Sequence, residues 1–158
     1  MKKLFFIGLL LLIVGLSDGS AQNYRTAIGF RGGLSNGLTV KHFIGGKAAV
    51  EGILATRWNG FNITALYEMD YAIADVNGLS WFWGVGGHIG FWDGSTSPWW
   101  NDNVTHTVIG VDGILGLEFT IPNAPICFQL DYKPGFNLVG YQGYWGDEFA
   151  VSIRFAIK

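Results

Sequence analysis

The sequence predicts an all-β fold, namely an eight-stranded antiparallel up-and-down β-barrel that spans a membrane. Apolar and polar residues alternate in runs between turn signals, and this period of two is typical of β-strands. No helical pattern separates the runs, so neighbouring strands are expected to be antiparallel. The chain is 16% aromatic and only 14% charged, against about 25% charged residues in ordinary soluble domains. This composition favours a sheet that faces something other than water.

The N-terminal segment is predicted to be a cleaved secretory signal. Two lysines form a positive start, residues 4–16 form an uncharged apolar run, and Gly19-Ser20-Ala21 has the pattern of a signal-peptidase site. The apolar run is shorter than the roughly 20 residues that a transmembrane helix needs. We therefore expect a signal peptide over residues 1–21 and a β-barrel domain over residues 22–158.

The charge and cysteine content exclude several classes of protein. Removal of the signal leaves 8 basic and 11 acidic residues, which is a formal charge of −3. This balance does not indicate a nucleic-acid partner. Cys127 is the only cysteine, so the chain cannot form an internal disulfide. No metal-ligand spacing occurs, and we expect neither a metal nor a cofactor.

Turn signals divide the domain into eight expected strands. Asn, Asp and Gly tolerate the positive φ of hairpin turns, and proline cannot donate to a β-ladder. The turn signals are Asn36-Gly37, Gly45-Gly46, Asn59-Gly60, Asn77-Gly78, Asp93-Gly94 and Pro122-Asn123-Ala124-Pro125. The strands are expected over Tyr24–Gly32, Gly37–Ile44, Lys47–Trp58, Phe61–Ile73, Leu79–Trp92, Thr107–Ile121, Ile126–Lys133 and Asp147–Ile157.

Alternation sorts the side chains of these strands into an apolar face and a face of charged and small residues. Six basic and six acidic residues share the second face, and we predict that they form an ion network inside the barrel. They are Arg25, Arg31, Lys41, Glu51, Arg57, Glu68, Asp70, Asp112, Glu118, Asp131, Lys133 and Arg154. We expect His88 and Cys127 to face the same interior, with His88 hydrogen-bonded there.

The size of the barrel decides which face points outward. A soluble lipocalin-like barrel would bury the apolar face, whereas a membrane barrel would expose it to lipid. Eight strands enclose an interior just wide enough for side chains to fill. The apolar face, with Trp81, Trp83 and many other large side chains, is too bulky for it. The charged face is rich in glycine and alanine, and aromatic residues gather near strand ends as in interfacial belts.

The lengths of the connections between strands also fit a membrane barrel. An even number of strands places both termini on one side, where the expected turns are short. On the other side, the connections over residues 93–106 and 134–146 are long, as external loops of outer-membrane barrels are. Trp99, Trp100, Tyr144 and Trp145 lie in these loops. Their exposed rings would bind a sugar, a partner or lipid headgroups, or else extend the aromatic belt.

The signal ending "SAQ", the stretch "GLEFTIPNAPICFQLDYKP" (Gly116–Pro134) and the closing "VSIRFAIK" resemble small outer-membrane barrels of Gram-negative bacteria. The similarity is to the eight-stranded OmpA/OmpX-like class. It implies an outer-membrane location with periplasmic termini and extracellular long loops. It also implies contact with the lipid bilayer and insertion by the barrel-assembly machinery, which reads an aromatic last strand. Here Phe155 would replace the usual terminal aromatic residue.

Candidate catalytic groups have structural explanations. His106, Asp102 and a loop serine could form a Ser/His/Asp arrangement, and Glu68 with Asp70 could form an acid/base pair. For Glu68 and Asp70 we expect membership of the interior ion network and not catalysis. We assign no catalytic residue. The predicted function is a structural or surface-interaction role without an open pore. The alternatives are a lipid-modifying outer-membrane enzyme, a narrow pore or a soluble ligand-binding barrel.

Overall fold

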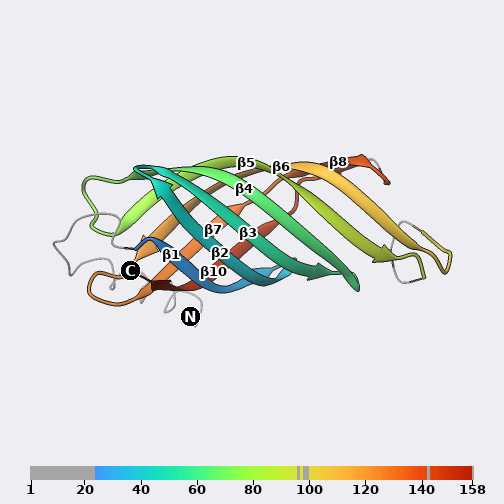
Figure 1. Ribbon diagram of the computed structural model, residues 1–158, viewed down its shortest axis with the longest axis horizontal. Helices are drawn as coiled ribbons and strands as arrows, with labels where there is room; N and C mark the ends of the chain where they lie inside the picture. The colour runs from blue at the N-terminus through green and yellow to red at the C-terminus, as the bar shows by residue number, and fades with distance from the viewer. Residues whose placement is uncertain (1–23, 96, 98–99, 142, 158) are drawn as a thin grey trace, which may run out of the picture.

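The computed structural model describes residues 24–95, 97, 100–141 and 143–157. The predicted signal peptide lies outside these residues. Within them the chain forms strands and no helix (Figure 1), and no helix there could cross a membrane. The strands are β1 (Thr26–Gly33), β2 (Asn36–Gly45), β3 (Ala48–Arg57), β4 (Gly60–Ala72), β5 (Leu79–Asp93), β6 (Thr105–Thr120), β7 (Ile126–Tyr132), β8 (Gly135–Val139), β9 (Gly143–Trp145) and β10 (Phe149–Ile157).

The strands close into a barrel. Every pairing is antiparallel, and the order β5-β4-β3-β2-β1-β10-β7-β6 becomes a ring because β5 also pairs with β6. β7 and β8 pair with successive parts of β6, so together they form one strand of the barrel. β9 and β10 likewise form one strand, because β9 pairs with β8 and β10 pairs with β7. The ten segments therefore form eight barrel strands in up-and-down order, which confirms the predicted fold class.

The expected loop over residues 134–146 is largely strand, so that prediction was wrong. Pro134 has no N–H to donate, but its carbonyl oxygen accepts a hydrogen bond of 2.9 Å from the N–H of Gly113 on β6. The ladder therefore continues past the proline into β8, which pairs with β9 in a hairpin. At this end of the barrel the connection between β5 and β6 is the longest.

Two turns lie earlier in the chain than their sequence signals. Asn36-Gly37 belongs to β2, and the turn before it lies at residues 34–35. Between β3 and β4 the residues with positive φ are Trp58 (50°) and Asn59 (54°). Gly60 is needed for a different reason, because a Cβ there would lie 2.0 Å from the Trp92 ring.

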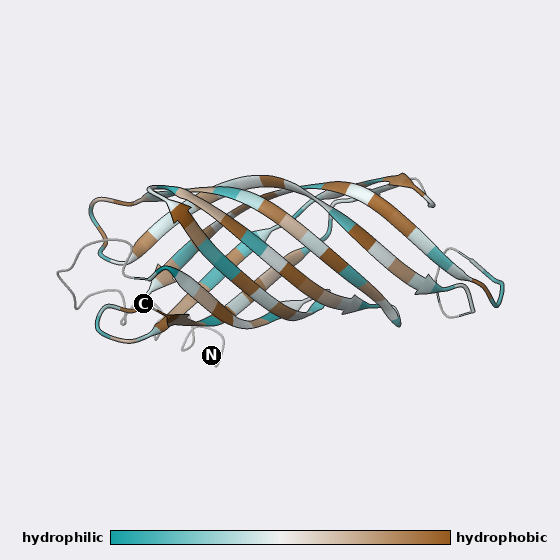
Figure 2. Ribbon diagram, in the orientation of Figure 1, coloured by the Kyte–Doolittle hydropathy of each residue, from teal (hydrophilic) through white to brown (hydrophobic). Residues whose placement is uncertain are grey.

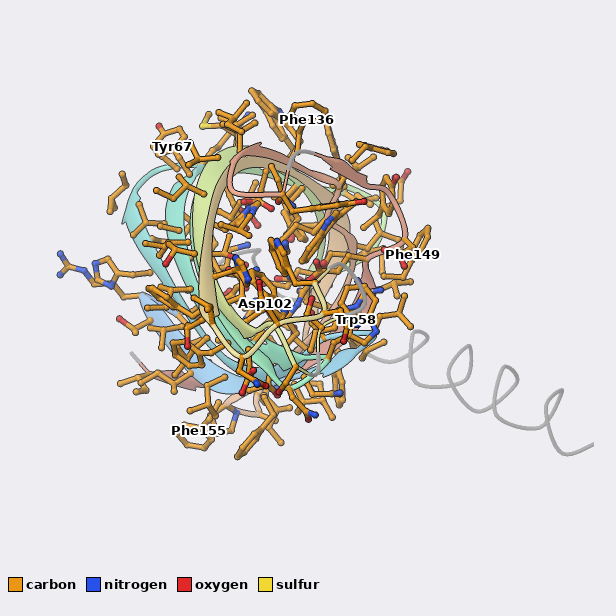
Figure 3. All side chains as sticks on the ribbon, turned by 90° about the vertical axis from the view of Figure 1, so that its right-hand side faces the viewer. Trp58, Tyr67, Asp102, Phe136, Phe149 and Phe155 are labelled. Atoms are coloured by element: carbon orange, nitrogen blue, oxygen red, sulfur yellow. The ribbon has the colours of Figure 1, made fainter. Side chains whose placement is uncertain are left out.

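The barrel is elongated and its strands are steeply tilted (Figure 1). We call the end where Thr26 pairs with Ile157 the terminal end and the opposite end the distal end. The β5–β6 hairpin extends furthest at the distal end, on the right of Figure 1. Hydrophobic and hydrophilic residues alternate along the strands that face the viewer in Figure 2. In the view along the barrel, Tyr67, Phe136, Phe149 and Phe155 point away from the ring of strands (Figure 3).

The interior holds charged side chains and three apolar clusters. One cluster lies among β3–β6 and consists of Ile53, Ala55, Leu66, Phe82 and Ile114. A second, at the terminal end, contains Tyr24, Ala27, Cys127 and Ala156. The third, at the distal end, contains Trp92, Val108 and Trp145. Charged groups contact these clusters: the Lys41 ammonium, for example, lies 4.3 Å from the centre of the Phe82 ring.

Candidate functional site

The interior ion network is the main concentration of chemically reactive side chains. The structure places ten of the twelve predicted residues in it, each no more than 5% exposed. They are Arg31, Lys41, Glu51, Glu68, Asp70, Asp112, Glu118, Asp131, Lys133 and Arg154. Alternation brings them inside, because every second residue of a strand faces the same side of the sheet.

The first part of the network, here called the terminal cluster, consists of Lys41, Glu51, Glu68, Asp70, Glu118 and Arg154. The Lys41 ammonium lies 3.0 Å from Glu68 Oε2, 3.0 Å from Asp70 Oδ1 and 3.4 Å from Glu118 Oε2. The Arg154 guanidinium donates to Glu51 Oε1 and to Glu118 Oε2, the latter at 3.3 Å. The two basic groups of the cluster, Lys41 and Arg154, are thus shared among its four carboxyl groups.

The second part, here called the distal cluster, consists of Arg31, Asp131, Glu148, Lys133, Asp112 and His88. Lys133 Nζ lies 3.1 Å from Asp112 Oδ1 and 3.1 Å from Glu148 Oε2. His88 Nδ1 lies 2.7 Å from Asp112 Oδ2, and His88 Nε2 lies 2.9 Å from Asn137 Oδ1. His88 is therefore a hydrogen-bonded interior residue.

Gln129 joins the two clusters. Its amide oxygen accepts a hydrogen bond of 2.5 Å from Arg154 Nη1 in the terminal cluster. Its amide nitrogen donates one of 3.0 Å to Asp131 Oδ2 in the distal cluster. The network is consequently continuous along the interior. Sequence reasoning did not single out Gln129, although it shares the inward parity of Asp131.

Arg25 corrects the predicted network, because it is exposed on the outside of the barrel. The chain bends at Arg25, and alternation starts only at Thr26. Tyr24, which strict alternation with an inward Arg25 would place on the outer face, is buried inside instead. Its hydroxyl donates a hydrogen bond of 2.5 Å to Glu118 Oε1.

Arg57 lies at the distal rim and is not part of the interior network. Its guanidinium donates to Asp147 at 3.2 Å and 2.7 Å, and it lies 3.8 Å from the centre of the Trp58 ring. These hydrogen bonds from Arg57 hold the pKa of the Asp147 carboxyl below its ordinary value. Asp147 was not among the predicted residues.

Glu148 is a network residue that sequence reasoning missed. It is 3% exposed and accepts a hydrogen bond of 2.6 Å from the Ser35 hydroxyl. Its even number matches the inward parity of Ser152 and Arg154 on β10, so the signal was present in the pattern. With Glu148 inside, Arg25 exposed and Arg57 paired with Asp147 at the distal rim, the interior network contains more acid than base.

The four aromatic loop candidates have different positions. Trp145 is buried at the distal end, where its ring contacts Trp92, Trp58 and His88. Trp100 is partly buried and stacks on His106 at 4.2 Å between ring centres. Tyr144 is 66% exposed, and Trp99 lies outside the described residues. Trp145 is thus part of an interior aromatic cluster and does not offer its ring for external contact.

In the His106 loop, Ser95 and Asp102, two of the candidate triad residues, have different partners. His106 Nε2 lies 2.9 Å from Asp102 Oδ1, and this interaction lowers the pKa of Asp102. The Ser95 hydroxyl instead donates to Asp93 at 2.8 Å. Trp100 and Tyr141 pack edge to face above the pair and link the β5–β6 and β8–β9 hairpins. The contacts are those of a loop clamp and not of an activated nucleophile.

Other kinds of site find little support in the described part of the chain. No group of three His, Cys, Asp or Glu side chains there is arranged to hold a metal ion. Comparisons with protein-family models, curated proteins and solved structures find no match to this chain.

Proposed function

We propose that this chain is an outer-membrane β-barrel protein with a structural or surface-interaction role and no open pore. The observation that supports this most strongly is the distribution of side chains. Large apolar residues are exposed on all ten strand segments, whereas ten charged residues of the predicted network are buried. Soluble monomers rarely expose a contiguous apolar patch larger than a few hundred Å². A bilayer would cover this surface.

The aromatic residues support a membrane position with two interfaces. On β4, Phe61 lies near the distal end and Tyr71 near the terminal end. Phe61 pairs across the ladder with Phe91, and Tyr71 stacks on Trp81 with 4.8 Å between the ring centres. Outer-membrane barrels have such aromatic girdles at both interfaces. The Lys47 ammonium lies 4.6 Å from the centre of the Tyr71 ring, where a headgroup region would solvate it.

The filled interior supports the absence of an open pore. Trp92, Arg31, Arg154, Lys41 and Phe82 are the largest of the side chains that are less than 2% exposed. They come from opposite walls of the barrel and occupy its interior, as expected for eight strands. Ion passage would require the buried ion pairs to separate, which is costly. We therefore expect no large steady conductance in planar bilayers.

The resemblance to OmpA/OmpX-like barrels supports periplasmic termini and an external β5–β6 loop. The last strand presents Phe149, Val151, Ile153, Phe155 and Ile157 outward, all at least 45% exposed. Such a strand would serve as the signal for the barrel-assembly machinery and would then contact lipid.

Membrane fractionation with surface proteolysis tests this proposal. The full chain with its signal is expressed in a Gram-negative host, with a protease site inserted after Ser95 in the β5–β6 connection. A matched variant carries the same site after Asn123, in the turn at the terminal end. We expect both proteins in the outer-membrane fraction and cleavage on intact cells only after Ser95. Recovery of the mature protein in the soluble periplasmic fraction would overturn the proposal.

A further inference from the structure

The interior of the barrel contains more acid than base. Among the described residues, seven buried carboxyl groups face four buried Lys and Arg side chains. The carboxyl groups belong to Glu51, Glu68, Asp70, Asp112, Glu118, Asp131 and Glu148. Burying an uncompensated ion costs several kcal/mol, and such a group is usually neutralised instead. The interior therefore needs additional positive charge.

The shortage is greatest in the terminal cluster, around Glu68. Lys41 is the nearest base, but its single ammonium is shared with Asp70 and Glu118. Apart from the Lys41 ammonium 3.0 Å from Oε2, neither oxygen of Glu68 has a donor, although both atoms are fully buried. Glu51 Oε2 also has no donor, whereas Glu51 Oε1 accepts from Thr39 and Arg154. Glu68 is thus the least satisfied carboxyl group of the network.

The ladder between β3 and β4 places these two carboxyl groups together. Glu51 pairs with Leu66 and Glu68 pairs with Ala49, so the two glutamates are diagonal neighbours on the inward face. Diagonal neighbours of this kind are within reach of long side chains. Both side chains are buried in the same interior. Two ionised carboxylates can only accept hydrogen bonds, so a direct hydrogen bond between them requires a proton on one of the two.

We propose that the Glu51–Glu68 pair is a proton-binding site, in which Glu68 is protonated at neutral pH and donates to Glu51. The ionisable groups around this pair come from five other strands, from β4 itself and from the N-terminal segment. They are Arg31 on β1, Lys41 on β2, Asp70 beside Glu68 on β4, Glu118 on β6, Cys127 on β7, Arg154 on β10, and Tyr24. Arg154 binds Glu51 and keeps it ionised, which leaves the proton on Glu68.

A proton fits this position better than a metal ion. The described residues contain no metal-holding group of carboxyl and histidine side chains, and the Lys41 ammonium already occupies the space between Glu68, Asp70 and Glu118. A cavity of about 10 Å³ at the terminal end is lined by Tyr24, Ser80, Glu118 and Thr120 among others. One water molecule fits such a volume. Such a water would lie beside Glu118, which belongs to the terminal cluster.

Infrared spectroscopy of the folded protein in detergent micelles tests this site, because a protonated carboxyl group has its own carbonyl stretching band. We expect the band in the wild-type protein at neutral pH. We expect Glu68→Gln to remove it, since glutamine keeps the size of the side chain and donates to Glu51 without a titrating proton. Glu148→Gln is the matched control, because Glu148 is bound by Lys133 and Ser35 and should not contribute to the band.

The outcomes separate the alternatives. Absence of the band in the wild-type protein at neutral pH would overturn the proposal, and this measurement does not depend on whether any variant folds. An unchanged band in folded Glu68→Gln would overturn it as well. A shift in the unfolding midpoint on adding Ca²⁺ or EDTA, lost in Glu68→Gln, would show that a metal ion supplies the missing charge instead.

Discussion

Arg31 and Asp131 form a two-pronged ion pair across the interior of the barrel. Arg31 Nη1 donates to Asp131 Oδ2 at 2.6 Å, and Arg31 Nη2 donates to Asp131 Oδ1 at 2.7 Å. Both side chains are completely buried. The two residues lie on β1 and β7, and β10 lies between these strands in the sheet. The pair therefore spans the place where the first and last strands of the barrel meet.

Replacing Arg31 by methionine is expected to destabilise the barrel by about 3–5 kcal/mol, because it leaves Asp131 buried without its partner. Chemical unfolding in detergent micelles measures this free energy. The double variant Arg31→Met/Asp131→Asn removes both charges and should recover a large part of the loss. The single variant Asp131→Asn completes the comparison. If the free energy lost in the double variant equals the sum of the losses in the two single variants, the two residues are not energetically coupled.

The last strand shows why most of the fold could be predicted from the sequence. Phe149, Val151 and Ile153 are exposed, while Ala150 and Ser152 are buried, as alternation requires. An extended backbone places successive side chains on opposite faces whatever their partners are. Once a strand is recognised, the direction of each side chain follows, and the inward positions of ten network residues follow from the same rule.

Alternation fails where the backbone leaves the strand geometry. At the bend of Arg25, Tyr24 is buried and Arg25 is exposed, which is the opposite of what alternation predicts. Beyond Pro134 the chain pairs with β6 again instead of forming a loop. Neither event has a local sequence signal. The pairing inside the network was equally unpredictable, because contacts such as Ser35 with Glu148 join residues 113 positions apart. Such contacts depend on the register and closure of the whole barrel.

The Arg57–Asp147 pair predicts a pH effect at the distal rim. Hydrogen bonds from Arg57 hold the pKa of Asp147 below its ordinary value, which is about 3.9. The pair therefore stabilises the barrel above that ordinary value, and the contribution is lost as the pH falls through the lowered pKa. Asp147 is well exposed, so the contribution should stay below about 1 kcal/mol.

Arg57→Gln should return the pKa of Asp147 to its ordinary value, as measured by a ¹³C NMR titration of the carboxyl carbon. An unchanged pKa would show that the pair does not persist in solution.

Trp145 is expected to stabilise the distal end without acting as the barrier to ions. Its ring packs against Trp92 with 5.5 Å between centres, and its side chain is nearly buried. Trp145→Ala should cost about 3 kcal/mol, as removal of a buried aromatic ring does, whereas Trp145→Phe should cost clearly less. The ion network below Trp145 remains filled, so planar bilayers should show no steady channels with either variant. Steady conductance with Trp145→Ala alone would identify the aromatic cluster as the only barrier.

Gly110 and Gly52 offer a matched pair of glycines that should respond in opposite ways. A Cβ at Gly110 would lie 2.4 Å from His88 Cε1 and 2.5 Å from the Phe136 carbonyl oxygen, whereas a Cβ at Gly52 meets nothing within 4 Å. Gly110→Ala must therefore displace the His88 ring and weaken its bond to Asp112, at a cost of about 1–3 kcal/mol. Gly52→Ala should be neutral or stabilising by up to about 1 kcal/mol, because alanine loses less backbone entropy on folding. Unfolding free energies of the two variants in the same micelles decide the matter. If the two variants are equally stable, the His88 ring is not held tightly between β5, β6 and β8, and the distal cluster does not depend on its position.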